Sequence, residues 1–108
     1  GKLVGSIAIN EIRSNHKLGN IGYWVRQSAQ GRRIAAEAVE AVAEFGFNHL
    51  GLLRLEIIAG VDNKASRRVA EKVNAVCEGL ARNRIILNNQ SIDAMVYSLI
   101  PSDLNRSV

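Results

Sequence analysis

Residues 23–37 read YWVRQSAQGRRIAAE, and this stretch decides the fold because a strand pattern changes within it to a helix pattern. Its aromatic and β-branched start predicts a strand, and the alanines and glutamate at its end predict the first turn of a helix. Gly31 and three arginines lie between the two elements. The first N–H groups of a helix lack partners within it and, together with the helix dipole, attract anions. A pyrophosphate suits such a turn, but an ordinary turn with solvated arginines explains the same residues.

An amphipathic helix is predicted to follow this turn over residues 34–50. Apolar residues recur at helical spacing through the range, and three glutamates occupy the opposite face. Gly51 follows the last apolar residue, where a glycine commonly ends a helix. A second helix is predicted to start at Asp62 or Asn63, either of which can cap it, and to run to about residue 73.

Short apolar runs rich in β-branched residues predict the strands. They cover residues 3–9, 20–26, 52–59, 76–80, about 84–87 and 94–100. The polar residues 11–18 predict a loop, Asn88 and Asn89 predict a turn, and residues 102–108 predict a polar tail. With the neighbouring runs at 76–80 and 84–87 counted as one position, the resulting order, β-β-α-β-α-β-β, predicts one α/β domain over residues 1–108. Its sheet should be mixed, because hairpins lie at both ends.

The composition is that of an ordinary globular protein, with 47% hydrophobic and 22% charged residues among 108. The net charge of +4 favours an anionic partner, such as a phosphate-bearing cofactor, a nucleic acid or an acidic protein, although it also serves solubility alone. Cys77 is the only cysteine, which excludes an intrachain disulfide and fits a cytoplasmic location. No apolar run is long enough for a membrane span, and no signal peptide is visible.

Motifs around the turn resemble those of the GNAT N-acetyltransferases, and in particular their ribosomal-protein alanine acetyltransferase branch. That branch carries IGYW, then QGKG, then a helix; here residues 21–24 read IGYW and residues 30–33 read QGRR. An Asn-x-x-Ser helix start, here Asn63 and Ser66, and a Glu-Gly step at residues 78–79 follow in the family's order. The resemblance covers nearly the whole chain, from about residue 3 to residue 99, and several motifs in the same order are more specific than any one of them.

The resemblance implies an acetyl-CoA-binding fold, with a mixed, mostly antiparallel sheet flanked by two helices and without the family's N-terminal strand and helices. It also implies acetyl transfer by direct attack of a primary amine on the thioester, so that the protein supplies orientation and electrostatics. It assigns cofactor contacts to Trp24, Val25, Arg26, Gln30, Gly31, Arg32, Arg33, Ile34, Ala35 and Asn63. No metal is expected.

Ser66 stands at the position of a serine that the resemblance implies as the proton donor to the leaving thiolate. A hydroxyl in a first helical turn also commonly bonds the local backbone, so a purely local role is the alternative. Glu11 and His16 follow the first predicted strand and are candidate general bases at the border of the acceptor site. Solvated loop residues are the alternative for both.

Other chemically capable side chains have simpler explanations. Glu56 is a third candidate base, but an ion pair with Arg54 or Lys72 is the preferred interpretation. Without a clear histidine partner, Cys77 is predicted to be a buried structural thiol. The tyrosine and tryptophan at residues 23–24 are interpreted as strand packing.

The chain departs from the family pattern at two places in the cofactor half. Arg33 stands where the family has a second loop glycine, and its side chain would either crowd a pyrophosphate or pair with it. Residues 73–75 read Val-Asn-Ala in place of Leu-Gly-Phe. Asn74 tolerates the left-handed conformation that glycine supplies, so the turn can survive the change.

The leading hypothesis is an acetyl-CoA-dependent N-acetyltransferase that acts on an amine such as a protein N-terminus. A non-catalytic relative that binds a cofactor or partner through the same surface is the first alternative, and a basic nucleic-acid-binding module is the second. Aromatic residues form only 5% of the chain, which argues against a stacking platform for single strands. An open sheet edge predicts a homodimer.

Overall fold

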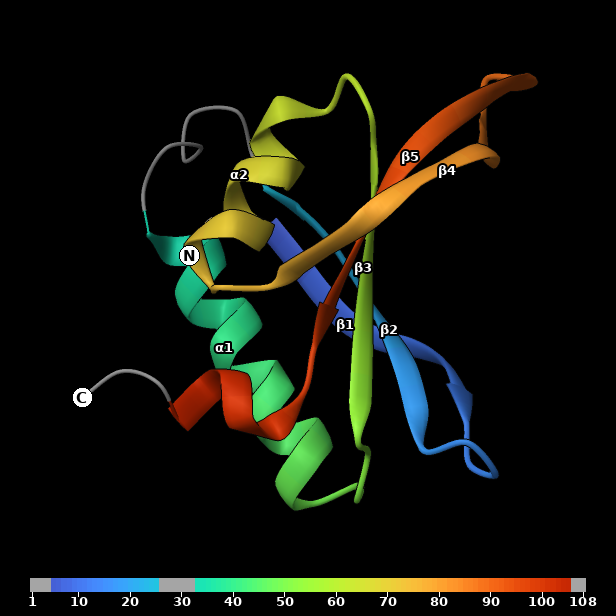
Figure 1. The fold of residues 1–108 in the computed structure, drawn as a ribbon. Coiled ribbons are helices and arrows are strands. Elements are labelled where there is room, and N and C mark those ends of the chain that lie inside the picture. Colours follow the sequence, from blue (N-terminus) through green and yellow to red (C-terminus); the bar gives the residue numbers. More distant parts are fainter. Residues whose placement is uncertain (1–4, 26–32, 106–108) are drawn as a thin grey trace.

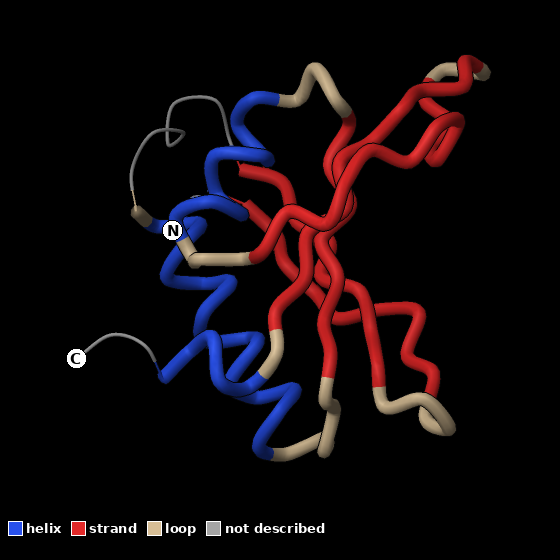
Figure 2. Tube along the Cα trace, viewed as in Figure 1, coloured by secondary structure: helices blue, strands red, loops and turns tan. Residues whose placement is uncertain are grey.

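The computed structural model describes residues 5–25 and 33–105. In chain order its elements are β1 (Gly5–Arg13), β2 (Leu18–Val25), α1 (Ile34–Asn48), β3 (Arg54–Gly60), α2 (Lys64–Lys72), β4 (Val76–Leu87), β5 (Gln90–Leu99) and a 3-10 helix, η2 (Pro101–Asn105). This order confirms the predicted succession of strands and helices. Figures 1 and 2 show one sheet with both α-helices on the same side of it.

The sheet is mixed and mostly antiparallel, as predicted. Its strand order is β1-β2-β3-β5-β4, so β3 is the central strand. The β1–β2, β3–β5 and β4–β5 pairs are antiparallel, whereas β2 and β3 are parallel. The parallel pair arises because α1 carries the chain from the end of β2 back to the start of β3, as a crossover helix does.

The hydrophobic core lies between the sheet and the helices. Residues of β3 alternate between buried and half-buried, which places Leu55, Ile57 and Ala59 on the helix-facing side. The other buried members come from β2, β5, the two helices and the segments that follow them: Ile21, Ala36, Val39, Ala43, Leu52, Ala70, Val73, Tyr97 and Leu99. Removal of this apolar surface from water is the main driving force for the fold.

Gly46 lets α1 lie close against the sheet. A Cβ atom at this position would stand 2.9 Å from Ile9 Cδ1 and 3.3 Å from Leu55 Cδ1. Glycine weakens the interior of a helix, so its place here is explained by the close approach of α1 to β1 and β3.

The first hairpin extends further than the sequence predicts. β1 continues to Arg13 and β2 begins at Leu18, so part of the predicted loop is strand. Glu11 has a φ of 50° and lies where the pairing register shifts between Asn10 and Arg13. A bulge of this kind lets a strand continue through a polar stretch in which apolar and polar residues do not alternate. The prediction from alternation therefore ended the strand too early.

β4 is one long strand where the sequence predicts two short ones. It spans Val76–Leu87 and pairs with β5 through two register shifts, one of them between Cys77 and Gly79. Gly79 has a φ of 140°, a conformation that other residues rarely adopt. These bulges interrupt the alternation in the middle of the strand. The predicted turn at residues 88–89 is confirmed, and both asparagines have a positive φ.

The chain beyond α2 and beyond β5 is ordered by local hydrogen bonds. Asn74 has a φ of 66°, and the Ala75 N–H donates to the Ala70 carbonyl at 3.0 Å, which confirms the left-handed turn predicted there. After β5 the chain forms η2, and Leu104 packs against the core. Residues 102–105 of the predicted polar tail therefore belong to the folded unit.

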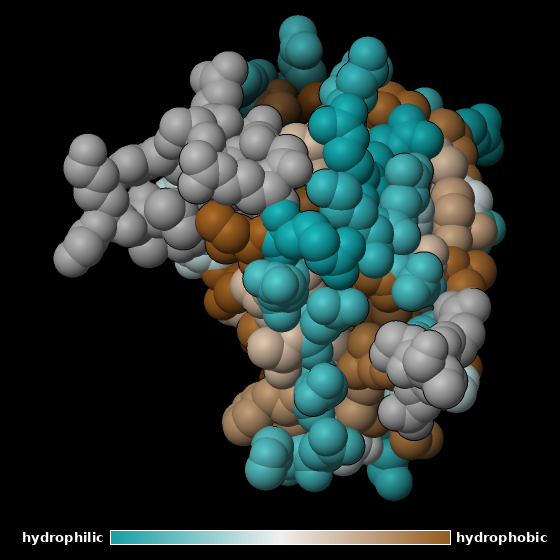
Figure 3. Space-filling view, turned by 90° about the vertical axis from the view of Figure 1, so that its left-hand side faces the viewer, coloured by the Kyte–Doolittle hydropathy of each residue, from teal (hydrophilic) through white to brown (hydrophobic). Residues whose placement is uncertain are grey.

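The helix-bearing side of the molecule is crossed by a band of hydrophilic residues, with hydrophobic surface on both sides of the band (Figure 3). Such a band is the solvent-facing side of amphipathic helices whose apolar faces cover the sheet. None of the described helices has the length and hydrophobicity of a transmembrane segment.

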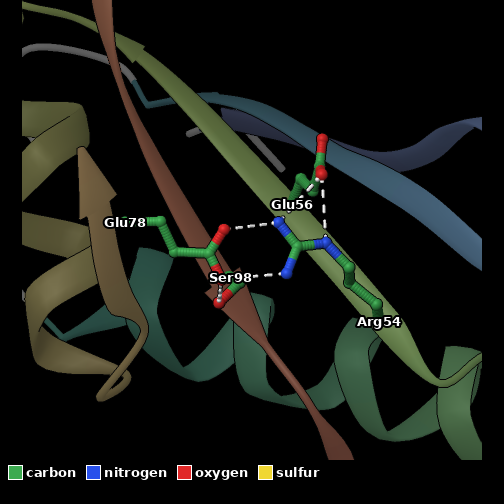
Figure 4. A network of polar contacts seen from close by, with 4 residues as sticks. All are labelled: Arg54, Glu56, Glu78 and Ser98. Atoms are coloured by element: carbon green, nitrogen blue, oxygen red, sulfur yellow. Dashed lines mark hydrogen bonds and ion pairs between the residues drawn. The ribbon is translucent and has the colours of Figure 1, made fainter. Parts of the chain in front are cut away.

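A polar network joins β3, β4 and β5 on the sheet face away from the helices (Figure 4). Arg54 donates two hydrogen bonds to the Glu78 carboxylate, at 2.7 and 2.9 Å, and one to Glu56 at 3.0 Å. The Ser98 hydroxyl donates to Glu78 at 2.7 Å. The ion pair preferred for Glu56 is therefore confirmed, with Arg54 as its partner. The Arg54–Glu78 bonds are the main cause that raises the pKa of Arg54 and lowers the pKa of Glu78 to about 2.

Acid should weaken the fold through this network. The pKa of Glu78 is about 2 in the folded protein, against an ordinary value of 4.5. Because the folded-state pKa is the lower one, the network stabilises the protein fully above pH 4.5 and loses that contribution as the pH falls toward about 2. We expect the free energy of unfolding, measured by urea denaturation, to fall across this pH window.

Glu78→Gln is the matched variant for this prediction. It should be less stable than the unchanged chain near neutral pH and should lose less further stability in acid, because the titrating carboxylate is gone. The Glu78 side chain is 41% exposed, so added salt should reduce the difference between the two proteins. An equally steep acid loss in Glu78→Gln would assign the loss to other carboxylates.

Candidate functional site

β2 and β3 separate after a short parallel pairing, and the gap between them is the central feature of the candidate site. Residues 18–20 of β2 pair with residues 54–56 of β3. β2 then continues to Val25 and β3 to Gly60. Figure 1 shows the two strands diverging toward the end of the sheet that carries α2. Alternate backbone groups of β2 beyond the pairing therefore face this gap without a described partner strand.

The N-terminus of α1 points toward the same end of the molecule (Figure 1). The first bond of the helix runs from the Glu37 N–H to the Arg33 carbonyl, at 2.9 Å. The N–H groups of Ile34, Ala35 and Ala36 therefore have no acceptor within the helix. Arg33 is exposed and its side chain makes no capping bond. These groups together can hold an anion.

Asn63 caps α2 and fixes the backbone of Ser66. The Asn63 Oδ1 accepts a hydrogen bond from the Ser66 N–H at 3.0 Å. Asn63 is thus the cap among the two residues that the sequence offers, and the Asn-x-x-Ser spacing is the spacing of a capping bond. Ser66 itself is half-buried in the first turn of the helix.

Tyr23 connects β2 to the same turn of α2. Its hydroxyl donates to the Ser66 carbonyl at 2.7 Å, although the two residues are 43 positions apart in the chain. Burial is the main cause that raises the pKa of Tyr23 to about 12, so the hydroxyl keeps its proton near neutral pH. Tyr23 packs against the core, as its interpretation as strand packing predicts. The bond to Ser66 was not predicted, although the two-residue spacing of Tyr23 from Ile21 indicates the helix-facing side of β2.

Arg67, the residue after Ser66 in α2, bonds to β5, which lies on the other side of β3 from β2. Its Nε donates to the Tyr97 hydroxyl on β5 at 3.3 Å, and its Nη1 donates to the Val61 carbonyl at 3.1 Å. The bond to Tyr97 is the main cause that raises the pKa of Arg67. The first turn of α2 is therefore held by side chains of β2 and β5 and by the loop that follows β3.

The two candidate bases from the first hairpin lie away from Ser66. His16 is exposed in the turn after β1. This turn lies beside the start of β3, because the Lys17 carbonyl accepts a hydrogen bond from the Leu53 N–H at 2.7 Å. Ser66 follows the other end of β3, whose seven residues span roughly 20 Å. Glu11 is exposed on the edge strand β1, two strands from β3. The structure does not bring Glu11 or His16 together with Ser66.

Some predicted cofactor contacts lie outside the described residues: Arg26, Gln30, Gly31 and Arg32. Trp24 and Val25 end β2 and pair with Ser6 and Gly5 of β1. Trp24 is exposed, so its ring is not strand packing of the kind predicted.

Cys77 is exposed, which corrects the prediction of a buried thiol. It lies on the edge strand β4, where one side has no described neighbouring strand to cover it. Within residues 5–25 and 33–105, no group of His, Cys, Asp and Glu side chains is arranged to hold a metal ion.

Comparison with known proteins identifies the fold and its relatives. Residues 1–76 match the Acetyltransferase (GNAT) domain family. The ribosomal-protein-serine acetyltransferase of Escherichia coli (strain K12) is 32% identical over 99 residues, which are 92% of this chain and 55% of that protein. The chain thus spans about half the length of the curated relatives that it matches.

Solved structures with bound coenzyme share the fold. Mycobacterium smegmatis RimJ in complex with CoA-disulfide is 27% identical, with a TM-score of 0.88 over 99% of this chain and 52% of that one. The microcin C7 self-immunity acetyltransferase MccE, in complex with acetyl-CoA and AMP, is 31% identical, with a TM-score of 0.81 over 92% of this chain and 55% of that one. The family match, the sequence relatives and the shared fold agree, and the chain belongs to the GNAT acetyltransferase family.

Proposed function

We propose that the chain binds acetyl-CoA in the gap between β2 and β3 and transfers the acetyl group to a primary amine, such as a protein N-terminus. The observation that carries the proposal is the pairing of these parallel strands over three residues only, followed by their separation. Relatives in complex with CoA-disulfide and with acetyl-CoA support the donor. Relatives named for a ribosomal protein and for spermidine support an acceptor of this class.

The residues around the gap fit an extended ligand that carries both amides and phosphates. Backbone groups of β2 beyond Asn20 can bond the amides of a pantetheine arm, as an added strand would. The N–H groups of residues 34–36, which have no acceptor within the helix, and the Arg33 guanidinium suit a pyrophosphate. Trp24, Val25 and Asn63 are proposed to line the arm between these two regions. The coenzyme supplies an activated thioester, and the chain holds it in place.

Ser66 is proposed to donate its hydroxyl proton to the sulfur as the carbon–sulfur bond breaks. The attacking amine, which forms the new carbon–nitrogen bond, releases one N–H proton to solvent, and the Ser66 oxygen recovers a proton from solvent. A thiolate leaves more readily when a nearby hydroxyl protonates it. Asn63 and Tyr23 bond the N–H and the carbonyl of Ser66, so the direction of its Cα–Cβ bond is fixed by the backbone. The geometry favours neither Glu11 nor His16 as the general base, because neither is brought near this turn.

Calorimetric titration with acetyl-CoA tests the proposal, together with an Arg33→Gly variant. We expect the unchanged chain to bind with a micromolar Kd and Arg33→Gly to bind about threefold to tenfold more weakly, because a cation near the phosphates is lost. Arg33 is exposed and has a φ of −75°, so its backbone conformation does not require glycine. Glycine is well tolerated at an N-cap, so the variant reports on the side chain.

Arg84→Ala is the control for this titration. It removes the same charge from an exposed position on the edge strand β4 and should change the Kd by less than about twofold. Tighter binding by Arg33→Gly would show that Arg33 crowds the ligand. No binding by any of the three proteins would overturn the donor proposal. Binding without release of free CoA in the presence of amines would favour the non-catalytic alternative.

We also propose that the chain forms a homodimer. β1 is an edge strand, and no described strand pairs with its outer side. Beside it, β1 and α1 border a groove of about 390 Å³ lined by apolar residues that include Ile9, Ile12, Val42 and Phe45. An open edge beside an apolar groove favours association. Light scattering at micromolar concentration measures the mass in solution, and a monomer would contradict the proposal.

A further inference from the structure

We propose that Tyr23 is a positioning residue that sets the width of the gap between β2 and β3 and fixes Ser66 at the edge of that gap. This inference rests on the proposed function, because the gap is the place proposed for the thioester donor. Tyr23 acts through the backbone of α2 and is not itself assigned a contact with the reacting atoms.

The separated part of β2 needs an attachment across the gap. Its strand pairing beyond Asn20 is with β1 alone among the described strands, from Ile21 opposite Ile9 to Val25 opposite Gly5. β1 is itself the edge of the sheet. Apolar contacts hold this two-stranded ribbon against the core, but the hydrophobic effect behind them is not directional. A hydrogen bond fixes both distance and direction.

The Tyr23 hydroxyl supplies this directional attachment. It donates to the Ser66 carbonyl at 2.7 Å and so joins β2 to the helix that follows β3. The Ser66 N–H is held at the same time by Asn63, at 3.0 Å. Both peptide groups next to Ser66 are therefore fixed, and with them the direction in which its side chain leaves the helix. A change at Tyr23 should move the gap and Ser66 together.

The attachment keeps the same protonation state near neutral pH. The phenol is a neutral donor and the carbonyl is a neutral acceptor, so neither partner gains or loses charge near neutral pH. Burial keeps the phenol protonated, since it raises the pKa of Tyr23 to about 12. The bond therefore acts as a fixed strut and not as a switch.

Tyr23→Phe and Tyr97→Phe form a matched pair that tests the inference. Each variant removes one hydroxyl that bonds the first turn of α2, but Tyr97 lies on β5, on the other side of β3 from the gap. We expect both to lower the thermal midpoint by similar amounts. Only Tyr23→Phe should weaken acetyl-CoA binding in calorimetric titration, by about fivefold, whereas Tyr97→Phe should leave the Kd unchanged.

Amide hydrogen exchange of the ligand-free proteins gives a second readout that does not depend on the donor. In Tyr23→Phe, exchange should become about fivefold faster at the start of α2 and at the amides of residues 21–25 that bond β1. In Tyr97→Phe the change should be confined to α2. This pattern would support the positioning role of the Tyr23–Ser66 bond even if Tyr23→Phe and Tyr97→Phe lower the thermal midpoint by different amounts.

The two readouts separate failure of this inference from failure of the proposed function. If the unchanged chain and Tyr23→Phe bind acetyl-CoA equally well, the inference is overturned and the proposed function stands. If the unchanged chain does not bind acetyl-CoA, the proposed function fails, and hydrogen exchange decides the inference alone. Unchanged exchange in residues 21–25 of Tyr23→Phe would then overturn it.

Discussion

Leu55→Ala should lower the free energy of unfolding by about 2 to 5 kcal/mol. Leu55 is completely buried in the central strand and lies between Gly19 of β2 and Leu99 of β5. Its Cδ1 lies 3.3 Å from the place that a Cβ at Gly46 would occupy, so it packs directly beneath α1. Truncation leaves a cavity between sheet and helix where β2 and β3 still pair.

Urea denaturation measures this change, and Leu53→Ala is its control. Leu53 stands two residues earlier and is 58% exposed, so its truncation should alter stability by less than about 0.5 kcal/mol. The midpoint temperature of Leu55→Ala should fall by roughly 10 to 20 °C. Equal effects of the two variants would contradict the packing described for β3, because they would show that burial does not distinguish the two leucines.

Hydrophobic periodicity predicted most of the fold, because the periodicity of a helix or strand can be recognised within a short stretch of sequence. The alternation from Leu55 to Ala59 identifies the central strand, and the helical spacing after Ile34 identifies α1. The bulges at Glu11 and Gly79 could not be predicted in this way. A bulge depends on how two strands fit together, and a single strand's pattern of apolar residues does not contain that information.

In the candidate site, too, contacts between residues close in the sequence could be predicted, whereas contacts between distant residues could not. Asn63 could be predicted as a cap because the bond to Ser66 spans three residues of one helix start. The bond from Tyr23 to Ser66 could not, since it spans 43 residues and exists only because β2 leaves β3 and passes near α2. The exposure of Cys77 likewise depends on β4 being an edge strand, which the order of strands along the chain does not reveal.

Ser66→Ala should lower kcat for acetyl transfer by about a hundredfold and leave the Kd for acetyl-CoA within about twofold. The two bonds that position Ser66 use its backbone N–H and carbonyl, and alanine keeps both. The variant therefore removes the hydroxyl without moving the turn that carries it. Release of free CoA thiol, followed with a peptide amine that the unchanged chain acetylates, measures kcat, and calorimetry measures the Kd.

Ser66→Thr tests whether the hydroxyl itself accounts for the loss. Threonine keeps an O–H at this position, so Ser66→Thr should recover much of the rate that Ser66→Ala loses. An unchanged kcat in Ser66→Ala with normal binding would assign the serine a local structural role, and the leaving sulfur would then take its proton from solvent. Because Tyr23 is proposed to position Ser66, loss of the Ser66 hydroxyl and loss of the Tyr23 hydroxyl should have different kinetic effects. Ser66→Ala should change kcat alone, whereas Tyr23→Phe should also change the Kd.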